Sequence, residues 1–285
     1  MAGRVAVTGG SGKLGRACVR DLVEHGWEVV NLDRAPSTDA LAPYTEVDLT
    51  DYGQAVEALT GIDDRYEGVD ALVHLAAIPA PGLKANAATF RNNALTTFNV
   101  FQAAKLAGIG NIVWASSETV LGLPFETPPP YLPIDEEYAP RPESTYSLVK
   151  TMEETMVEQF CRWDPELKAT GLRFSNVMYV SDYAAFPAFE DDPLLRKWNL
   201  WSYIDARDGA QAIRLALGRE GAGREVCVIA SPDTVMSTPT MDLVNAYYPD
   251  LELRRPVSGH ESLMSTEKAR RLFGYDPRHT WRNHI

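Results

Sequence analysis

Short apolar, β-branched segments alternate with longer amphipathic segments through the first 174 residues of the chain. Each apolar segment has the length of a buried strand, and the segments between them have the spacing of helices that cover a sheet. The expected strands are Arg4–Thr8, Glu28–Asp33, 44–47, 71–75, 111–116 and 169–174. The expected helices begin near Lys13, Asp51, Thr89 and Thr145. This order predicts a doubly wound α/β fold with a parallel sheet, in which ligands bind at the carboxyl ends of the strands.

The first expected strand runs directly into a turn with three glycines, Gly9, Gly12 and Gly15. Gly9 allows a chain reversal, Gly12 lets backbone N–H groups approach a pyrophosphate, and Gly15 lets the next helix pack against the strand. The helix N-terminus adds free N–H donors and a partial positive charge. An ordinary strand-to-helix turn can have the same spacing. The second strand, which ends in Asp33, makes a dinucleotide site the favoured interpretation.

Asp33 lies 18 positions beyond Gly15. An acidic residue there accepts hydrogen bonds from the adenosine ribose and repels a 2′-phosphate, which favours NAD over NADP. The neighbouring Arg34 keeps NADP open as a cofactor, because a guanidinium can bind a 2′-phosphate or stack on adenine.

Further loop residues follow the third and fourth strands. Asp48, with Leu49 after it, either accepts the adenine amino group or helps to begin the next helix, and the two interpretations are compatible. The small residues 75–77 would let the cofactor pass close to the backbone. His74 is interpreted as a buried sheet residue, because no second metal ligand stands near it in the sequence.

Residues 89–108 are apolar and alanine-rich around the whole helix circumference, so we expect them to be buried in the domain or in a subunit contact. Asn93 within this segment is either a helix-bending hydrogen bonder or a brace for the active site. The proline-rich stretch 124–142 is expected to form a surface loop near the mouth of the active site. It should end where Ser144 or Thr145 caps the next helix.

Tyr146 and Lys150 stand four positions apart at the start of that helix, which places both side chains on one face. A phenol is a poor base at pH 7, and lowering its pKa to about 7 requires about 4 kcal/mol. We expect this from Lys150, the nicotinamide charge and burial together. Ser117, after the fifth strand, can reach the same place and bind the reacting oxygen. Tyr and Lys four apart also occur by chance in helices. A serine after a strand, a Tyr and Lys four apart after the next loop, and a glycine turn upstream are together harder to obtain by accident.

Composition narrows the class of protein. The 285 residues are 45% apolar and 23% charged, as in a globular chain, and the net charge of −12 argues against a nucleic-acid partner. Three distant cysteines, Cys18, Cys161 and Cys227, suggest reduced thiols. Because neither a leader nor a membrane-spanning segment is evident, we expect a cytoplasmic protein with no membrane partner. No set of metal ligands is predicted.

The combination of motifs resembles the extended short-chain dehydrogenases/reductases of the NAD-dependent epimerase/dehydratase type. The matching segments are TGGSGKLG (8–15), Asp33, Asp48-Leu49, HLAA (74–77), Asn93, ASSETVLG (115–122), YSLVK (146–150), LRFSNV (172–177) and YIDARD (203–208). The resemblance implies a Rossmann domain of residues 1–176 and 203–230. It also implies a small substrate-binding lobe of residues 177–202 and 231–285, with a homodimer formed through the helices at 89–108 and 146–162.

The resemblance also implies roles for individual residues. Ser117, Tyr146 and Lys150 would be the catalytic triad, and Asn93 would brace the proton relay. The expected substrate-binding residues are Ser117, Glu118, Tyr146 and Asn176. The expected cofactor-binding residues are Gly9, Ser11, Gly12, Lys13, Leu14, Gly15, Asp33, Arg34, Asp48, Leu49, Leu75, Ala76, Ala77, Ser116, Tyr146 and Lys150.

Two departures from the family pattern narrow the expected activity. Family dehydratases carry an Asp-Glu pair after the catalytic Ser or Thr, whereas Glu118 and Thr119 stand there in this chain, which disfavours dehydration. Only 26 residues separate Asn176 from Tyr203, which suggests a substrate smaller than a nucleotide-sugar. The pair Arg196-Lys197 can bind an anion, but a solvated helix face is the favoured interpretation.

The leading hypothesis from the sequence is an NAD-dependent oxidoreductase that oxidises a hydroxyl of a small, carbohydrate-like substrate, as uronate or aldose dehydrogenases do. The alternative is an NAD-dependent sugar or nucleotide-sugar epimerase with the same three catalytic residues. A non-catalytic dinucleotide sensor is disfavoured, because such family members typically lose the Tyr and the Lys, and both stand here.

Overall fold

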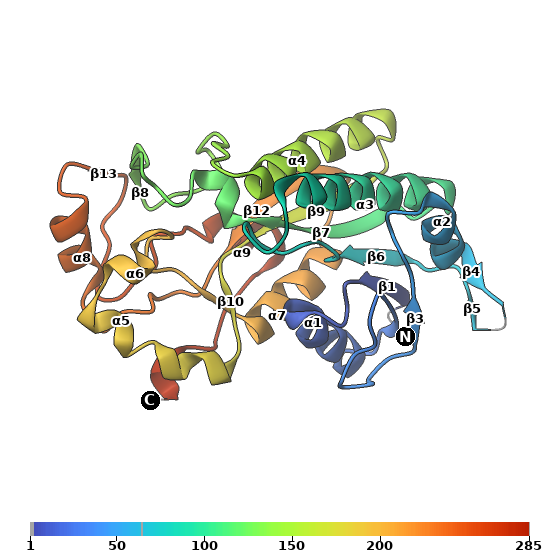
Figure 1. Cartoon of the computed structure of the whole chain (residues 1–285), viewed down its shortest axis with the longest axis horizontal. Helices are drawn as coiled ribbons and strands as arrows, with labels where there is room; N and C mark the ends of the chain where they lie inside the picture. The colour runs from blue at the N-terminus through green and yellow to red at the C-terminus, as the bar shows by residue number, and fades with distance from the viewer. Residues whose placement is uncertain (1–2, 64, 285) are drawn as a thin grey trace.

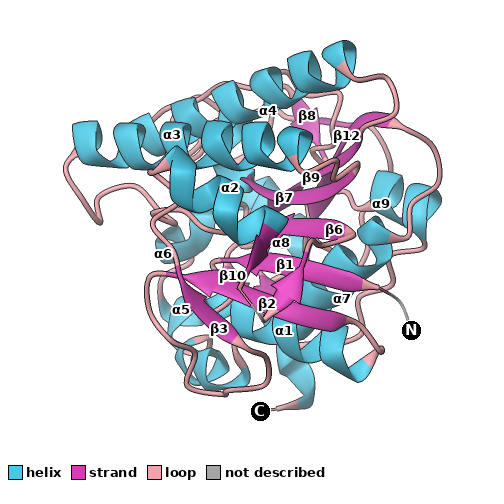
Figure 2. Ribbon diagram, turned by 90° about the vertical axis from the view of Figure 1, so that its right-hand side faces the viewer, coloured by secondary structure: helices cyan, strands magenta, loops and turns pink. Residues whose placement is uncertain are grey.

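The protein is described here by a computed structural model, which covers residues 3–63 and 65–284. Its centre is a parallel sheet of seven strands in the order β12-β9-β7-β6-β1-β2-β3 (Figures 1 and 2). These strands are β1 (Arg4–Thr8), β2 (Glu28–Asp33), β3 (Tyr44–Glu46), β6 (Ala71–His74), β7 (Asn111–Ser117), β9 (Lys168–Phe174) and β12 (Gly223–Ile229). The doubly wound α/β fold predicted from the alternating pattern is confirmed.

Helices cover both faces of the sheet (Figure 2). On one face lie α2 (Tyr52–Thr60), α3 (Asn86–Leu106) and α4 (Thr145–Trp163). On the other lie α1 (Lys13–Glu24), α7 (Ala206–Leu217) and α9 (Glu267–Phe273). Each layer closes a separate apolar core against the strands. A short hairpin of β4 (Gly61–Ile62) and β5 (Tyr66–Glu67) follows α2.

The six expected strands are present, and the sequence pattern missed the seventh, β12. Its first three residues, 223–225, are only partly buried, and its last four are fully buried. Because β12 is an edge strand, only its second half carries the apolar pattern that reveals a buried strand.

A third core lies beside the sheet, in the small lobe seen at the left of Figure 1. Its elements are η2 (Val180–Ala185), α5 (Ala188–Asp191), α6 (Leu194–Lys197), α8 (Thr240–Tyr247) and the pairs β10 (Val177–Met178) with β11 (Ile204–Asp205) and β8 (Tyr131–Leu132) with β13 (Glu252–Leu253). Two further short helices are η1 (Glu118–Leu121) and η3 (Trp281–Asn283). The predicted division into a Rossmann domain and a lobe remains a prediction. Two features cross it: α9, from the predicted lobe, packs against β12 and α7, and residues 120–138, from the predicted Rossmann domain, contribute to the core of the lobe.

The proline-rich stretch 124–142 was expected to form a surface loop, but only part of it does. Within it β8 pairs with β13, and Leu132 and Ile134 are completely buried in the core of the lobe. The prediction failed because prolines exclude a helix or a central strand but do not exclude an irregular segment that fills a core. The end of the stretch is as expected, since Ser144 caps α4 by accepting a hydrogen bond from the Ser147 N–H.

Helix α3 is not buried around its circumference. Its inward face carries polar side chains such as Asn93 and Thr97, while Phe90 and Phe98 are 38% and 43% exposed. Large apolar side chains therefore face outward in the single chain. None of the helices in the described part of the chain combines the length and the hydrophobicity needed to span a membrane.

The fold contains one tight contact that a single methyl group would disrupt. A Cβ on Gly171 in β9 would lie 2.5 Å from Cζ2 of Trp114, which is fully buried on β7. We expect Gly171→Ala to lower the free energy of unfolding in urea by about 2 kcal/mol, because overpacked cores must shift. Gly110→Ala is the matched control, since nothing lies within 4 Å of its added Cβ. An equal effect of both substitutions would contradict this assignment.

Candidate active site

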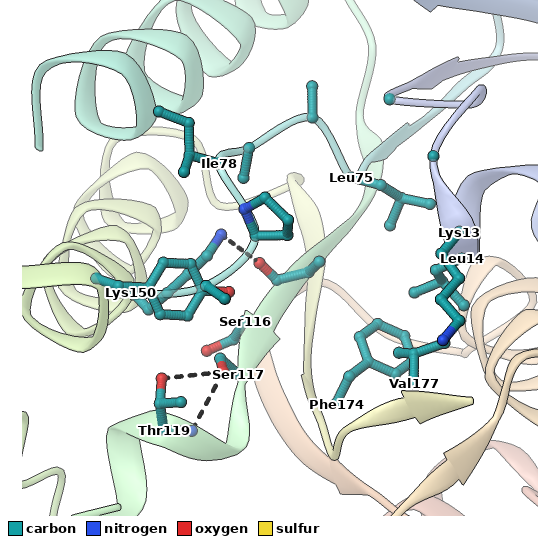
Figure 3. A pocket seen from close by; sticks show the side chains of 18 of the residues that line it. Lys13, Leu14, Leu75, Ile78, Ser116, Ser117, Thr119, Lys150, Phe174 and Val177 are labelled. Atoms are coloured by element: carbon teal, nitrogen blue, oxygen red, sulfur yellow. Dashed lines mark hydrogen bonds between the residues drawn. The ribbon is translucent and has the colours of Figure 1, made fainter. Parts of the chain in front are cut away.

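A cavity of about 1010 Å³ opens at the carboxyl ends of the strands, between the glycine turn and α4. Figure 3 shows Lys13, Leu14 and Val177 on one side of it and Lys150 with Ser117 on the other. The predicted residues that line it are Gly9, Ser11, Gly12, Lys13, Leu14, Gly15, Asp33, Arg34, Leu49, Leu75, Ala76, Ala77, Ser116, Ser117, Glu118, Tyr146, Lys150 and Asn176. Two predicted site residues, Asp48 and Asn93, are not among the described residues that line the cavity.

The glycine turn has no room for side chains at its first and last glycine. Gly9 has a φ of +70°, and a Cβ there would lie 2.7 Å from the Ala76 backbone nitrogen. A Cβ on Gly15 would lie 2.1 Å from the Gly9 carbonyl oxygen. The turn therefore packs backbone against backbone, and it brings the N-terminus of α1 to the cavity.

Asp33 and Arg34 follow β2 at the edge of this turn. One carboxylate oxygen of Asp33 accepts from the Ser11 N–H at 3.0 Å, so the acid lies beside the glycine turn. Arg34 forms an ion pair with Asp48 at 2.5 Å. Hydrogen bonds from Arg34 and Thr50 lower the pKa of Asp48 to about 2. The adenine role of Asp48 remains a prediction, while the helix that follows is capped by Asp51.

His74 belongs to the sheet, as predicted. It is buried, and its ring bonds the Thr8 hydroxyl at 2.7 Å and the Thr97 hydroxyl at 3.2 Å. Burial, together with the charge of Lys150, lowers its pKa to about 3. The Thr8 hydroxyl also accepts from the backbone N–H groups of Leu75 and Ala76. The side chains of His74 and Thr8 thereby hold the loop that follows β6 against the glycine turn.

Asn93 braces that same loop from α3. Its amide accepts from the Ile78 N–H at 2.8 Å and donates to the Ile78 carbonyl at 3.0 Å. Ile78 lines the cavity, so Asn93 shapes the wall from behind. Its proposed part in a proton relay remains a prediction.

Ser117, Tyr146 and Lys150 meet at the end of β7. The Ser117 hydroxyl oxygen accepts from the Thr119 N–H and hydroxyl at 3.2 and 3.0 Å (Figure 3). This leaves the Ser117 proton to be donated elsewhere. Lys150 donates to the Ala115 carbonyl and to the Glu153 carboxylate, each at 2.8 Å. The predicted triad therefore lines one wall of the cavity.

The pKa of Tyr146 is raised in the chain by itself, because burial disfavours the phenolate more than the charge of Lys150 favours it. The expectation that burial helps to lower this pKa is therefore wrong in sign. The positive charge near the phenol comes from Lys150, which is kept ionised by Glu153 although burial opposes its charge. Glu153 was missed, although it lies three positions after Lys150 on the same helix face.

A second buried ion pair fixes α4 to the sheet. The Glu154 carboxylate accepts from the Arg173 guanidinium on β9 through two bonds, at 2.9 and 2.8 Å. It also accepts from the Ser116 hydroxyl at 2.6 Å. Both partners are almost completely buried, so Glu154 sets the position of the helix that carries Tyr146 and Lys150.

Glu118 forms the polar end of the cavity next to the small lobe. Its carboxylate is 3% exposed and accepts from the Ser175 hydroxyl at 2.6 Å and the Asn199 amide at 3.2 Å. Burial raises its pKa to about 7, although these hydrogen bonds and the charge of Arg196 oppose the rise. Glu118 is thus a carboxyl group that titrates near neutral pH.

Arg196 was expected on a solvated helix face, but the structure places it in the interior. It is 5% exposed, and it donates to the Asn176 side-chain oxygen at 2.9 Å and to the Ser202 carbonyl at 2.6 Å. Burial lowers its pKa to about 10. The sequence could not reveal this, because α6 has only four residues, of which Arg196 alone is buried. Since Arg196 occupies the Asn176 oxygen, Asn176 has its amide N–H groups left for a ligand in the cavity.

Comparison with known proteins identifies the family. The sequence model of the "NAD dependent epimerase/dehydratase family" matches residues 5–188, more than half of the chain. The chain belongs to this family. It is an enzyme family, and the resemblance stated from the motifs is confirmed.

Several curated relatives in this family are UDP-glucose 4-epimerases. The mouse enzyme is 31% identical over 240 residues, covering 77% of this chain and 63% of the relative. The Bacillus subtilis enzyme is 29% identical and covers 70% and 59%. An NAD-dependent glucose-6-phosphate dehydrogenase of Haloferax volcanii is 32% identical over 53% of this chain and 60% of the relative. The chain thus spans about six tenths of the length of these relatives.

Solved structures share the fold. UDP-glucose 4-epimerase from Bifidobacterium longum in complex with NAD+ and UDP has a TM-score of 0.74 at 18% identity, covering 99% of this chain and 95% of the other. A mutated uronate dehydrogenase has a TM-score of 0.68 at 19% identity, with coverages of 98% and 83%. These likenesses establish the fold.

The residues present fit the NAD named in the family's description. A side chain at Gly9 or Gly15 would collide with backbone, so the turn keeps the bare surface that a pyrophosphate needs. Asp33 stands at the end of β2, and the helix N-terminus faces the same cavity. Within residues 3–63 and 65–284, no group of three or more His, Cys, Asp or Glu side chains is placed to hold a metal ion.

The raised pKa of Glu118 predicts a pH dependence of stability. A carboxyl with an ordinary value near 4.5 that titrates near 7 in the fold stabilises the protein fully below pH 4.5. That contribution is lost as the pH rises through 7. Between pH 5 and pH 8 we expect the wild type to lose about 2 kcal/mol more unfolding free energy than Glu118→Gln, measured by urea denaturation.

Glu126→Gln is the control for that experiment, because it changes an exposed carboxylate in the same loop region. It should follow the wild type at both pH values. A Glu118→Gln variant that also follows the wild type would show that Glu118 is ionised throughout this range.

Proposed function

We propose that this enzyme is an NAD-dependent sugar epimerase, which oxidises a secondary hydroxyl and then reduces the resulting ketone from its other face. The observation that carries the proposal is the meeting of Ser117, Tyr146 and Lys150 in the cavity that begins at the glycine turn. The curated UDP-glucose 4-epimerases among its relatives support epimerisation over net oxidation.

The glycine turn and Asp33 would hold NAD, which would supply the acceptor and the donor of the hydride. Tyr146 takes the proton of the substrate hydroxyl and gives it back in the return step, and Ser117 donates a hydrogen bond to the reacting oxygen. Lys150 supplies the positive charge that favours the phenolate. Its ammonium already bonds Ala115 and Glu153, so its orientation is fixed before a ligand arrives.

Glu118 does not act here as the acid of a dehydratase. Its carboxylate bonds Ser175 and Asn199, which hold it at the lobe end of the cavity. The next residue is Thr119, whose hydroxyl bonds Ser117 rather than supplying a second carboxylate. This arrangement supports transfer of hydride and proton without loss of water.

Net oxidation of a small sugar is the second candidate. It is supported by the short segment 177–202, whose 26 residues suggest a substrate smaller than a nucleotide-sugar. Within this segment the Arg196 guanidinium lies over the rings of Phe189 and Trp198. A non-catalytic sensor is disfavoured, because both Tyr146 and Lys150 line the cavity. We also propose that the enzyme is cytoplasmic, which its three free and buried cysteines support.

An assay of net turnover separates the two candidates. We expect UDP-glucose or a free sugar to be converted to its epimer, measured by chromatography, while absorbance at the reduced-nicotinamide band stays constant. Accumulation of NADH in proportion to product would instead establish the dehydrogenase. We expect Tyr146→Phe to lower kcat by at least 100-fold, the scale of general acid-base catalysis. Normal turnover by this variant would refute the assignment of Tyr146 as the base.

The protein is also proposed to form a homodimer through α3 and α4. These helices lie side by side on one face of the sheet (Figure 1), and both carry exposed apolar side chains. Those with at least 38% exposure are Phe90, Leu95, Phe98, Leu106, Leu148, Met152 and Trp163. Groups of exposed apolar side chains are typical of interfaces between proteins.

Sedimentation equilibrium tests the dimer. We expect the wild type to sediment as a dimer and the double variant Phe98→Glu and Met152→Glu as a monomer, because a buried unpaired carboxylate is costly. Leu194→Glu is the matched control, since Leu194 is 57% exposed on α6 in the small lobe. A monomeric wild type, or dissociation by the control, would contradict this interface.

A further inference from the structure

The segment that enters the small lobe is bonded to the first turn of α1. The Tyr179 hydroxyl donates to the Lys13 carbonyl at 2.5 Å, and the Asp182 carboxylate forms an ion pair with the Lys13 ammonium at 2.5 Å. Arg16 Nε donates to the Tyr179 hydroxyl at 3.3 Å. We call this set of contacts, Tyr179 and Asp182 against Lys13 and Arg16, the clasp.

The clasp is organised on both sides. Asp182 also accepts from the Tyr179 N–H at 2.6 Å, which caps η2 and holds the two lobe residues together. The cations of Lys13 and Arg16 lie 5.3 and 5.4 Å from the centre of the Tyr179 ring. One tyrosine therefore receives two positive side chains from successive turns of the same helix.

The clasp lies at the part of the cavity where the glycine turn meets the lobe. Lys13 and Leu14 line the cavity, and so does Val177, two residues before Tyr179. Figure 3 shows the Lys13 side chain extending alongside Leu14 toward Val177. The chain thus ties the residues that begin α1 to the start of the lobe across this side of the cavity.

We propose that Tyr179 and Asp182 retain NAD, because they tie the lobe to the turn that holds the cofactor. NAD then leaves after the clasp has opened. The inference deepens the proposed function, and rests on it in so far as an epimerase needs its cofactor to stay bound between two hydride transfers. Tyr179 and Asp182 act through Lys13 and Arg16, so they are positioning residues.

The energetics of the clasp suit a reversible closure. The side chains of Lys13 and Asp182 are 41% and 35% exposed, so water competes for their ion pair. A hydrogen bond of ordinary net strength changes an equilibrium by about fivefold. We therefore expect each clasp residue to slow release by a factor of about five, and the two together by about 25-fold.

The experiment measures release of NADH from the purified protein in a stopped-flow instrument. Protein loaded with NADH is mixed with a large excess of NAD, and the loss of NADH fluorescence gives the release rate. Tyr179→Phe removes the hydroxyl and keeps the ring, while Asp182→Asn removes the charge and can still cap η2. Each should release NADH about five times faster than the wild type, with a nearly unchanged association rate.

Matched controls come from the same lobe. Asp192→Asn changes an exposed aspartate whose carboxylate accepts from the Leu194 N–H, and Tyr247→Phe removes a hydroxyl from a tyrosine of α8. Both should release NADH at the wild-type rate. Unchanged rates in the clasp variants, or equal acceleration in the controls, would overturn the proposal. Complete loss of binding in Tyr179→Phe would also overturn it, since it would place the tyrosine inside the cofactor site.

The result is independent of the proposed reaction, because no sugar is present in the release assay. Net accumulation of NADH with a sugar would refute the epimerase and leave the release rates as they are. Equal release rates would refute the clasp and leave the epimerase assay as it is.

Discussion

The structure depends on close backbone packing at the glycine turn. Because a Cβ on Gly15 would lie 2.1 Å from the Gly9 carbonyl oxygen, the first turn of α1 packs directly against the backbone that follows β1. Further close contacts follow from this position. A Cβ on Gly209 in α7 would lie 2.9 Å from Leu14, and the loop after β6 rests against Gly9. Three segments far apart in the sequence therefore meet at one edge of the sheet, and two of them, the glycine turn and the loop after β6, line a cavity of the size a dinucleotide and a substrate need.

The opposite wall is held by buried charges. Glu154 binds Arg173 of β9 in a bidentate pair, and Glu153, its neighbour, holds the Lys150 ammonium. Such pairs cost desolvation energy, and they are weak evidence for stability. Their consequence here is geometric. The helix that carries Tyr146 and Lys150 is fixed in position and orientation before any ligand arrives, which is the preorganisation that proton transfer requires.

The small lobe contributes a third set of polar contacts, and it approaches the cavity at two separate places. Near the proposed catalytic residues, Arg196 orients Asn176, and Asn199 bonds Glu118. At the glycine turn, Tyr179 bonds the first residue of α1. The lobe therefore touches the cavity both near Tyr146 and at the glycine turn, although its own apolar core lies beside the sheet. A movement of this lobe would change both ends of the cavity together.

The sequence alone predicted six of the seven sheet strands, the helices between them and the glycine turn, and it brought forward Ser117, Tyr146 and Lys150 as a candidate triad, because these depend on local spacing and on residue types with few substitutes. It also indicated the family, whereas the choice between oxidation and epimerisation shifted only when relatives were compared. Only the tertiary structure decided that burial outweighs the charge of Lys150 at Tyr146, and it alone decided the buried place of Arg196, the core role of Leu132 and the outward apolar face of α3. Each of these depends on what lies across the chain from a residue. A pattern along the sequence contains no information about the dielectric surroundings or charge partners that distant segments provide.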